Sequence, residues 1–124
     1  MYLRKAIQLI TMLALFVAAG CAEKQVSFSK DVMPILEKNC LTCHKAGGTG
    51  YIASGLNMES YDNLMKGTKF GPVITPGYSF SSTLQILVEH KADTSINMPR
   101  DLPRLSQDNI ELIGKWINQG AKNN

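Results

Sequence analysis

Cys40-Leu41-Thr42-Cys43-His44 has the C-x-x-C-H pattern of a site at which haem is attached covalently to a protein. Two thiols separated by two residues can both reach the vinyl groups along one edge of a porphyrin. The imidazole beside the second cysteine then lies under the iron and can bind it. The pattern therefore predicts one haem c, with thioether bonds at Cys40 and Cys43 and an iron–nitrogen bond at His44.

Two other kinds of site share part of this pattern. A thioredoxin-like redox pair also uses C-x-x-C, but it requires a βαβ context, and the sequence shows no strand-rich frame. A zinc ion could use Cys40, Cys43 and His44 as ligands. However, an adjacent cysteine and histidine do not easily face one tetrahedral ion, and the sequence has no second cysteine pair to complete the ligand set. Both alternatives stay open beside the haem site.

The first twenty residues have the composition of a signal peptide. A positive region with Arg4 and Lys5 precedes a mostly apolar stretch that is too short for a typical membrane span. The A-A-G-C sequence that ends at Cys21 resembles a bacterial lipobox, with Ala18 where leucine is usual. We therefore expect a lipoprotein signal peptide over residues 1–20 and lipidation of Cys21. A plain secretory peptide is the alternative.

The cysteine count agrees with this assignment. One cysteine for lipid and two for haem account for all three, so no disulfide is expected. The short polar segment 21–27 is expected to be a tether, and acylation of Cys21 would hold an exported protein on a periplasm-facing membrane. Ala22 is not the aspartate that retains lipoproteins in the inner membrane of some bacteria, which favours the outer membrane.

Length and charge favour one small domain over residues 28–124. Removal of the signal peptide leaves about 100 residues, which suits a single domain. Loss of Arg4 and Lys5 lowers the formal net charge from +3 to about +1. This charge is not the basic footprint of a nucleic-acid-binding protein, so nucleic acid is not an expected partner.

Helical patterns lie at both ends of this domain. Asp31 is the expected N-cap of a first helix that presents the haem cysteines at its C-terminal end. Ser106 is the expected N-cap of the last helix, and Gly120 is expected to end it. The apolar stripe of the last helix consists of Ile110, Ile113 and Ile117, with Leu112 and Trp116 beside them. We expect this stripe to pack against the first helix.

The middle of the domain combines loops with short helices. Residues 45–55 are rich in glycine and are predicted to be loop, either to let the backbone pass close to the proximal haem face or to be flexible. Ser60 is expected to cap a short helix that ends at Gly67. A further helix is expected to end near His90, before a loop over residues 93–105.

That loop contains the expected sixth ligand of the iron. Met98 lies immediately before Pro99, which fixes the backbone, and a thioether ligand would raise the reduction potential. The other methionines of the mature chain sit in or beside helical patterns, where such side chains are normally core. His90 is the rival ligand, although a histidine after a helix is usually a surface residue. Arg100 and Arg104 are either partners of the haem propionates or solvated.

The order of these features is characteristic. It comprises Asp31-Val32-x-Pro34-Ile35-Leu36, C-x-x-C-H, a Gly-rich loop with Gly55-Leu56, Gly71-x-Val73-Ile74-x-Pro76-Gly77, Met98-Pro99 and Trp116-Ile117-x-x-Gly120-Ala121. From about Phe28 to Ala121 the chain resembles the small class I-like domains known as planctomycete-type cytochrome c. The resemblance implies an all-α fold of about three to five helices around one covalent haem, with crossing terminal helices and His44/Met98 ligation.

The predicted function is that of a lipid-anchored carrier of single electrons between redox partner proteins, not of an enzyme. One alternative is a gas-binding, peroxide-binding or sensory haem module with a labile sixth ligand. No distal His-Arg pair is evident in the sequence, which counts against a peroxidase. Another alternative is a redox-silent haem module that docks a partner enzyme.

Overall fold

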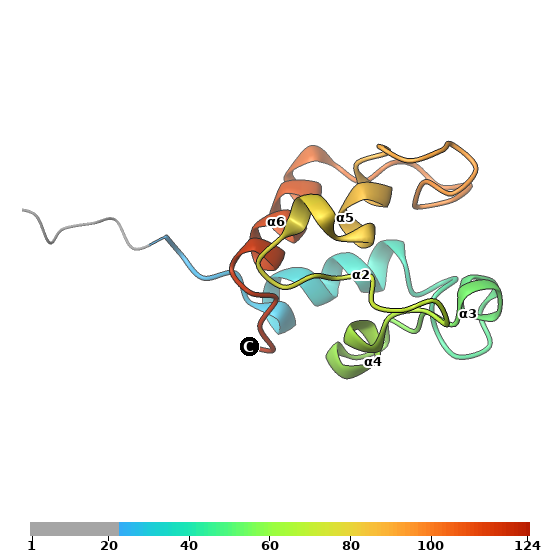
Figure 1. Ribbon diagram of the computed structural model, residues 1–124, viewed down its shortest axis with the longest axis horizontal. Coiled ribbons are helices and arrows are strands. Elements are labelled where there is room, and N and C mark those ends of the chain that lie inside the picture. The colour runs from blue at the N-terminus through green and yellow to red at the C-terminus, as the bar shows by residue number, and fades with distance from the viewer. Residues whose placement is uncertain (1–22) are drawn as a thin grey trace, which may run out of the picture.

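Helices make up the regular secondary structure of residues 23–124, which are the residues that the computed structural model describes (Figure 1). In chain order they are the π-helical turn η1 (Phe28–Val32), α2 (Met33–Asn39), α3 (Thr49–Ser54), α4 (Tyr61–Lys66), the 3-10 turn η2 (Ser79–Ser81), α5 (Thr83–Val88) and α6 (Gln107–Asn118). Within this range the extended pairing is limited to one isolated bridge between Thr68 and Gly71. The predicted all-α fold is confirmed.

The first helical segment begins earlier than the sequence pattern indicated. Ser27, not Asp31, is its N-cap, because the Ser27 hydroxyl accepts the N–H of Lys30 at 3.3 Å. Asp31 lies inside the first turns, and its Oδ2 accepts the N–H of Ser27 at 2.8 Å, so the two side chains form a reciprocal cap. The helix continues as α2 and ends one residue before Cys40.

The segment expected to be a tether contacts the C-terminal end of α6. Gln119 Oε1 accepts the N–H of Val26 at 2.8 Å, and Gln119 Nε2 donates to the carbonyl of Lys24 at 3.1 Å. Val26 is buried in the core. Packing of the domain therefore begins within the predicted tether, before Phe28, because one apolar residue in a polar stretch finds a buried position.

Helix α6 packs across η1, which confirms the expected crossing of the terminal helices. Trp116 is fully buried at this crossing, with its ring centroid 5.4 Å from that of Phe28 and 6.4 Å from that of Tyr61. The Trp116 Nε1–H donates to the carbonyl of Lys122 at 2.9 Å, so the buried indole keeps a hydrogen bond. The stripe residues Ile110, Ile113 and Ile117 are buried as predicted.

The predicted N-caps Ser60 and Ser106 are confirmed, whereas one predicted loop is wrong. The hydroxyls of Ser60 and Ser106 each accept a backbone N–H three residues further on, at 3.2 and 3.3 Å. The stretch 45–55 is not loop throughout, because it contains α3. Gly48 and Gly55 flank this helix, and Gly55 ends it with a left-handed φ of 80°. Glycines that suggested a loop thus serve as the boundaries of a short helix.

Two predictions concern residues that the structure does not describe. The signal peptide over residues 1–20 and the lipidation of Cys21 fall outside the described residues. Among the helices of residues 23–124, none combines the length and apolar composition needed to cross a bilayer.

Candidate haem-binding site

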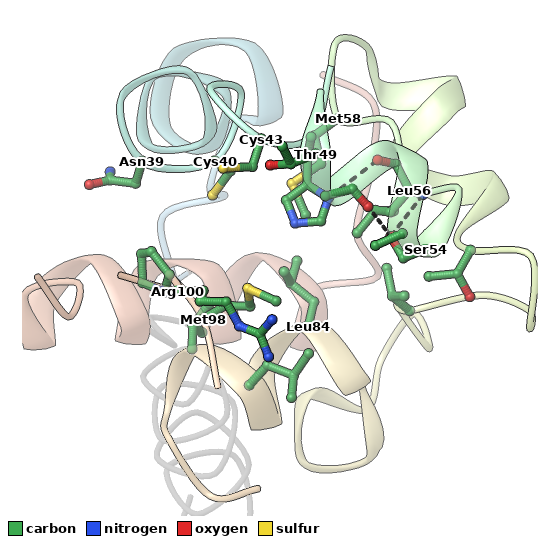
Figure 2. A pocket seen from close by; sticks show the side chains of 18 of the residues that line it. Asn39, Cys40, Cys43, Thr49, Ser54, Leu56, Met58, Leu84, Met98 and Arg100 are labelled. Carbon is green, nitrogen blue, oxygen red and sulfur yellow. Dashed lines mark hydrogen bonds between the residues drawn. The ribbon is translucent and has the colours of Figure 1, made fainter. Parts of the chain in front are cut away.

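A largely apolar cavity of about 510 Å³ lies between α2, α3, α5 and the loop that contains Met98. Its volume falls in the range of pockets that hold cofactors. The apolar wall consists of Leu56, Met58, Val73, Leu84, Leu87 and Val88. Figure 2 shows Cys40 and Cys43 on one side of the cavity, with Met98 and Leu84 facing them from the other side.

Both predicted haem cysteines line this cavity. The N–H groups of Cys43 and His44 donate to the carbonyl of Cys40 at 3.1 and 2.9 Å, so the C-x-x-C-H stretch forms a tight turn after α2. Both thiols are free. The turn therefore presents two thiols and the adjacent histidine to a single cavity, as covalent haem attachment requires.

The thioredoxin-like and zinc alternatives find no support in this geometry. Burial and, to a smaller extent, the neighbouring Cys43 together raise the pKa of the Cys40 thiol to about 11, whereas a nucleophilic redox cysteine needs a lowered pKa. In residues 23–124, no three His, Cys, Asp or Glu side chains converge in a way that could hold a metal ion. Cys40, Cys43 and His44 are thus not arranged as zinc ligands.

The ring of His44 is buried and held from one side. Its Nδ1 lies 3.3 Å from the carbonyl oxygen of Leu56 and can donate to it, which leaves Nε2 as the nitrogen available to a metal. Burial lowers the pKa of His44, and the contact with Leu56 acts in the opposite direction. The net effect favours the neutral imidazole, which is the form that binds iron.

Helix α3 packs its backbone against this ring at Gly50. A Cβ atom on Gly50 would lie 2.7 Å from Cε1 and 2.9 Å from Nε2 of His44, which is closer than carbon atoms approach in proteins. Only glycine therefore fits at this position. One expectation for the Gly-rich stretch is that it lets the backbone pass close to the proximal side of the site. Gly50 is the residue at which the backbone does so.

Substituting Gly50 by alanine is expected to displace the His44 ring and to lower the free energy of unfolding by about 1–3 kcal/mol, the usual cost of overpacking. At an open helical position the same substitution would stabilise the protein by up to about 1 kcal/mol. Whether the free energy of unfolding falls or rises therefore tests the contact between Gly50 and the His44 ring. Urea unfolding of the two proteins measures it.

Gly47→Ala is the matched control. Gly47 has a φ of +78°, and no atom lies within 4 Å of an added Cβ. This substitution should lower the free energy of unfolding through backbone strain alone. It should leave the absorption spectrum of the haem protein unchanged, whereas Gly50→Ala should alter it. A stabilised Gly50→Ala protein with an unaltered spectrum would contradict the contact.

The structure separates the two candidates for the sixth ligand. Met98 lines the cavity, and its N–H donates to the carbonyl of Leu87 at 3.1 Å. His90 is exposed, and its Nε2 lies 3.0 Å from the carbonyl oxygen of Met98. His90 therefore contacts the backbone of the loop from outside, and the side chain of Met98 is the one that reaches the site (Figure 2).

Arg100 and Arg104 also differ in whether they line the cavity. Arg100 lines the cavity and also donates to the carbonyl of Ser95. Arg104 donates to the carbonyl of Glu89 at 3.3 Å and does not line the cavity. Of the two, Arg100 is thus the one placed beside a ligand that carries carboxylates.

The residues that surround the cavity fit a haem. Two thiols lie on one side, a buried imidazole offers its Nε2, a thioether faces them, and the remaining wall is apolar. The bonds assigned to Cys40, Cys43, His44 and Met98 stay predictions. The carbonyl of Leu56 and the close approach of Gly50 were not predicted, because both depend on contacts between segments that no local sequence pattern records.

Comparison with known proteins gave two matches. The model of the family described as Planctomycete cytochrome C matches residues 40–101, which is half of the chain. The hydrazine synthase subunit alpha of Kuenenia stuttgartiensis is 24% identical over 127 residues, which cover 81% of this chain and 16% of that protein. The chain thus spans about a sixth of the length of this relative. No solved structure matched significantly.

Proposed function

Because this chain belongs to the planctomycete cytochrome c family, we propose that it binds one haem c covalently and carries single electrons between redox proteins. The observation that supports this proposal best is the convergence of Cys40, Cys43, His44 and Met98 on one apolar cavity. When bound there, haem supplies an iron that accepts and returns one electron.

Each residue has a distinct task in this proposal. The thiols of Cys40 and Cys43 would hold the cofactor on the chain through thioether bonds to its vinyl groups. The carbonyl of Leu56 holds Nδ1 of His44, which would leave Nε2 to bind the iron. Met98 would supply a thioether ligand to the iron, which would favour the reduced state. The apolar wall limits the access of water to the site.

A carrier is favoured over a catalytic site because the cavity offers two side chains, His44 and Met98, that could both bind the iron. An iron with two protein ligands needs little rearrangement on electron transfer and offers no open position to a substrate. The alternative is a haem module with a labile sixth ligand that binds a gas or peroxide. The relative named as a subunit of hydrazine synthase makes this alternative worth testing directly.

The lipid and the location belong to the same proposal. A lipid on Cys21 would hold the domain on a periplasm-facing membrane, with the outer membrane favoured by Ala22. A tethered domain meets membrane-bound redox partners at a higher effective concentration than a free one.

One pair of measurements on the purified haem protein tests the proposed function. We expect a reversible one-electron redox titration and no rapid binding of carbon monoxide by the reduced protein. Rapid and complete binding of carbon monoxide would favour the gas- or peroxide-binding alternative. A titration that is not reversible would favour the redox-silent module.

A further inference from the structure

Two aromatic side chains are exposed together at turn η2. Tyr78 is 56% exposed and Phe80 is 78% exposed, and their ring centroids lie 6.1 Å apart in an edge-to-face arrangement. The rings pack on each other, and more than half of each side chain remains exposed. Neither residue lines the cavity of the candidate haem site. An exposed aromatic pair of this kind indicates an interaction surface.

Turn η2 lies beside the N-terminal segment of the described chain. The N–H of Ser79 donates to Oδ1 of Asn118 at 2.9 Å, at the C-terminal end of α6. The same end of α6 binds the N-terminal segment through Gln119, and Glu23 and Ser79 line one shared surface cleft. Figure 1 shows residues 23–27 entering the domain at this end.

The N-terminal segment is held at several points. Glu23 Oε1 pairs with Lys115 Nζ at 2.8 Å, and the carbonyl of Lys24 accepts from Gln119. Cys21 precedes Glu23 by two residues, and two residues of extended chain span at most about 7 Å. A lipid on Cys21 would therefore bring the membrane surface close to this end of α6, and with it close to turn η2.

We propose that Tyr78 and Phe80 enter the interface of the phospholipid bilayer and so fix the orientation of the domain on the membrane. The proposal rests on the lipid at Cys21 that forms part of the proposed function. Aromatic rings favour the level of the lipid headgroups, where a tyrosine hydroxyl stays hydrated while its ring is buried. Lys24 and Lys122 are exposed at the same end of α6 and suit anionic headgroups.

This orientation has a consequence for electron transfer. Helix α3 and the loop over residues 93–105, which border the cavity, lie at the end of the domain opposite to residues 23–27 (Figure 1). With turn η2 on the bilayer, the cavity side faces the aqueous compartment. Partners would then reach the haem site from the solvent side, without release of the domain from the membrane.

Hydroxyl-radical footprinting of the full, exported chain in vesicles of phosphatidylethanolamine and phosphatidylglycerol tests this proposal. Mass spectrometry reports the oxidation of each aromatic residue, normalised to its oxidation in the urea-unfolded protein. Phe70 is 85% exposed and provides a control within the same molecule. The exposed fractions of these side chains predict how strongly Tyr78 and Phe80 should be oxidised relative to Phe70 in the absence of a bilayer contact. We expect the measured oxidation of Tyr78 and Phe80, relative to that of Phe70, to be several-fold lower than this prediction.

The outcomes distinguish the proposal from the lipid anchor on which it rests. Oxidation in proportion to exposure, on a protein whose intact mass includes the lipid, would overturn the bilayer contact and leave the anchor in place. Protection that grows with the protein-to-lipid ratio would identify a second copy of the chain as the occupant and would also overturn it. An intact mass without lipid would overturn both the anchor and the contact.

Discussion

Replacing Cys40 and Cys43 together by alanine is expected to abolish covalent attachment of haem. The two thioethers are the bonds by which the cofactor would be joined to the chain, so none would survive denaturation in the double variant. Mass spectrometry under denaturing conditions should find one haem on the wild-type chain, coexpressed with a c-haem maturation system, and none on the variant. Because the cavity of about 510 Å³ would lose a covalently held occupant, the variant should also unfold at a lower urea concentration.

Single substitutions and a ligand variant serve as controls for this result. Cys40→Ala and Cys43→Ala each keep one thiol, so each should retain haem through a single bond. Met98→Ala keeps both thiols and should retain haem through denaturation as wild type does. Haem that resists denaturation in the double variant would contradict attachment at these cysteines.

Patterns with a local cause were predictable from the sequence. The C-x-x-C-H stretch and the cap of α6 at Ser106 depend on residues close together in the chain, and the structure places both as expected. The apolar stripe of Ile110, Ile113 and Ile117 follows the helical period, and it therefore indicates both α6 and the face that packs on η1.

Features that depend on distant segments were not predictable in this way. Val26 is buried in the core, and Gln119, more than ninety residues away, accepts its N–H. The Gly-rich pattern predicts loop where helix α3 forms, because the glycines that flank this helix also occur in flexible segments. The sequence favours Met98 over His90 as the sixth ligand, but it does not show that Met98 lines the cavity or that the His90 ring contacts the Met98 carbonyl. Tertiary contacts, rather than residue propensities, settle the position of each of these residues.

Replacing Met98 by alanine is expected to remove the weak ferric sulfur-to-iron absorption band and to lower the reduction potential. Alanine has no donor atom, and the loss of a thioether removes the ligand that stabilises ferrous iron. Axial ligands set haem potentials over a range of roughly 0.8 V, so a decrease on the order of 0.1 V is expected. Absorption spectra of both redox states and a redox titration of wild type and variant measure these changes.

His90→Ala is the matched control, because it changes the rival ligand in the same part of the fold. His90 is exposed, and its ring contacts the backbone carbonyl of Met98. Its loss should therefore leave the sulfur-to-iron band in place. The reverse pattern, a band that persists in Met98→Ala, would show that another residue is the sixth ligand. A high-spin spectrum of the wild type would show that neither side chain binds. The gas- or peroxide-binding function would then be favoured, since an iron with one axial ligand leaves a position open to a substrate.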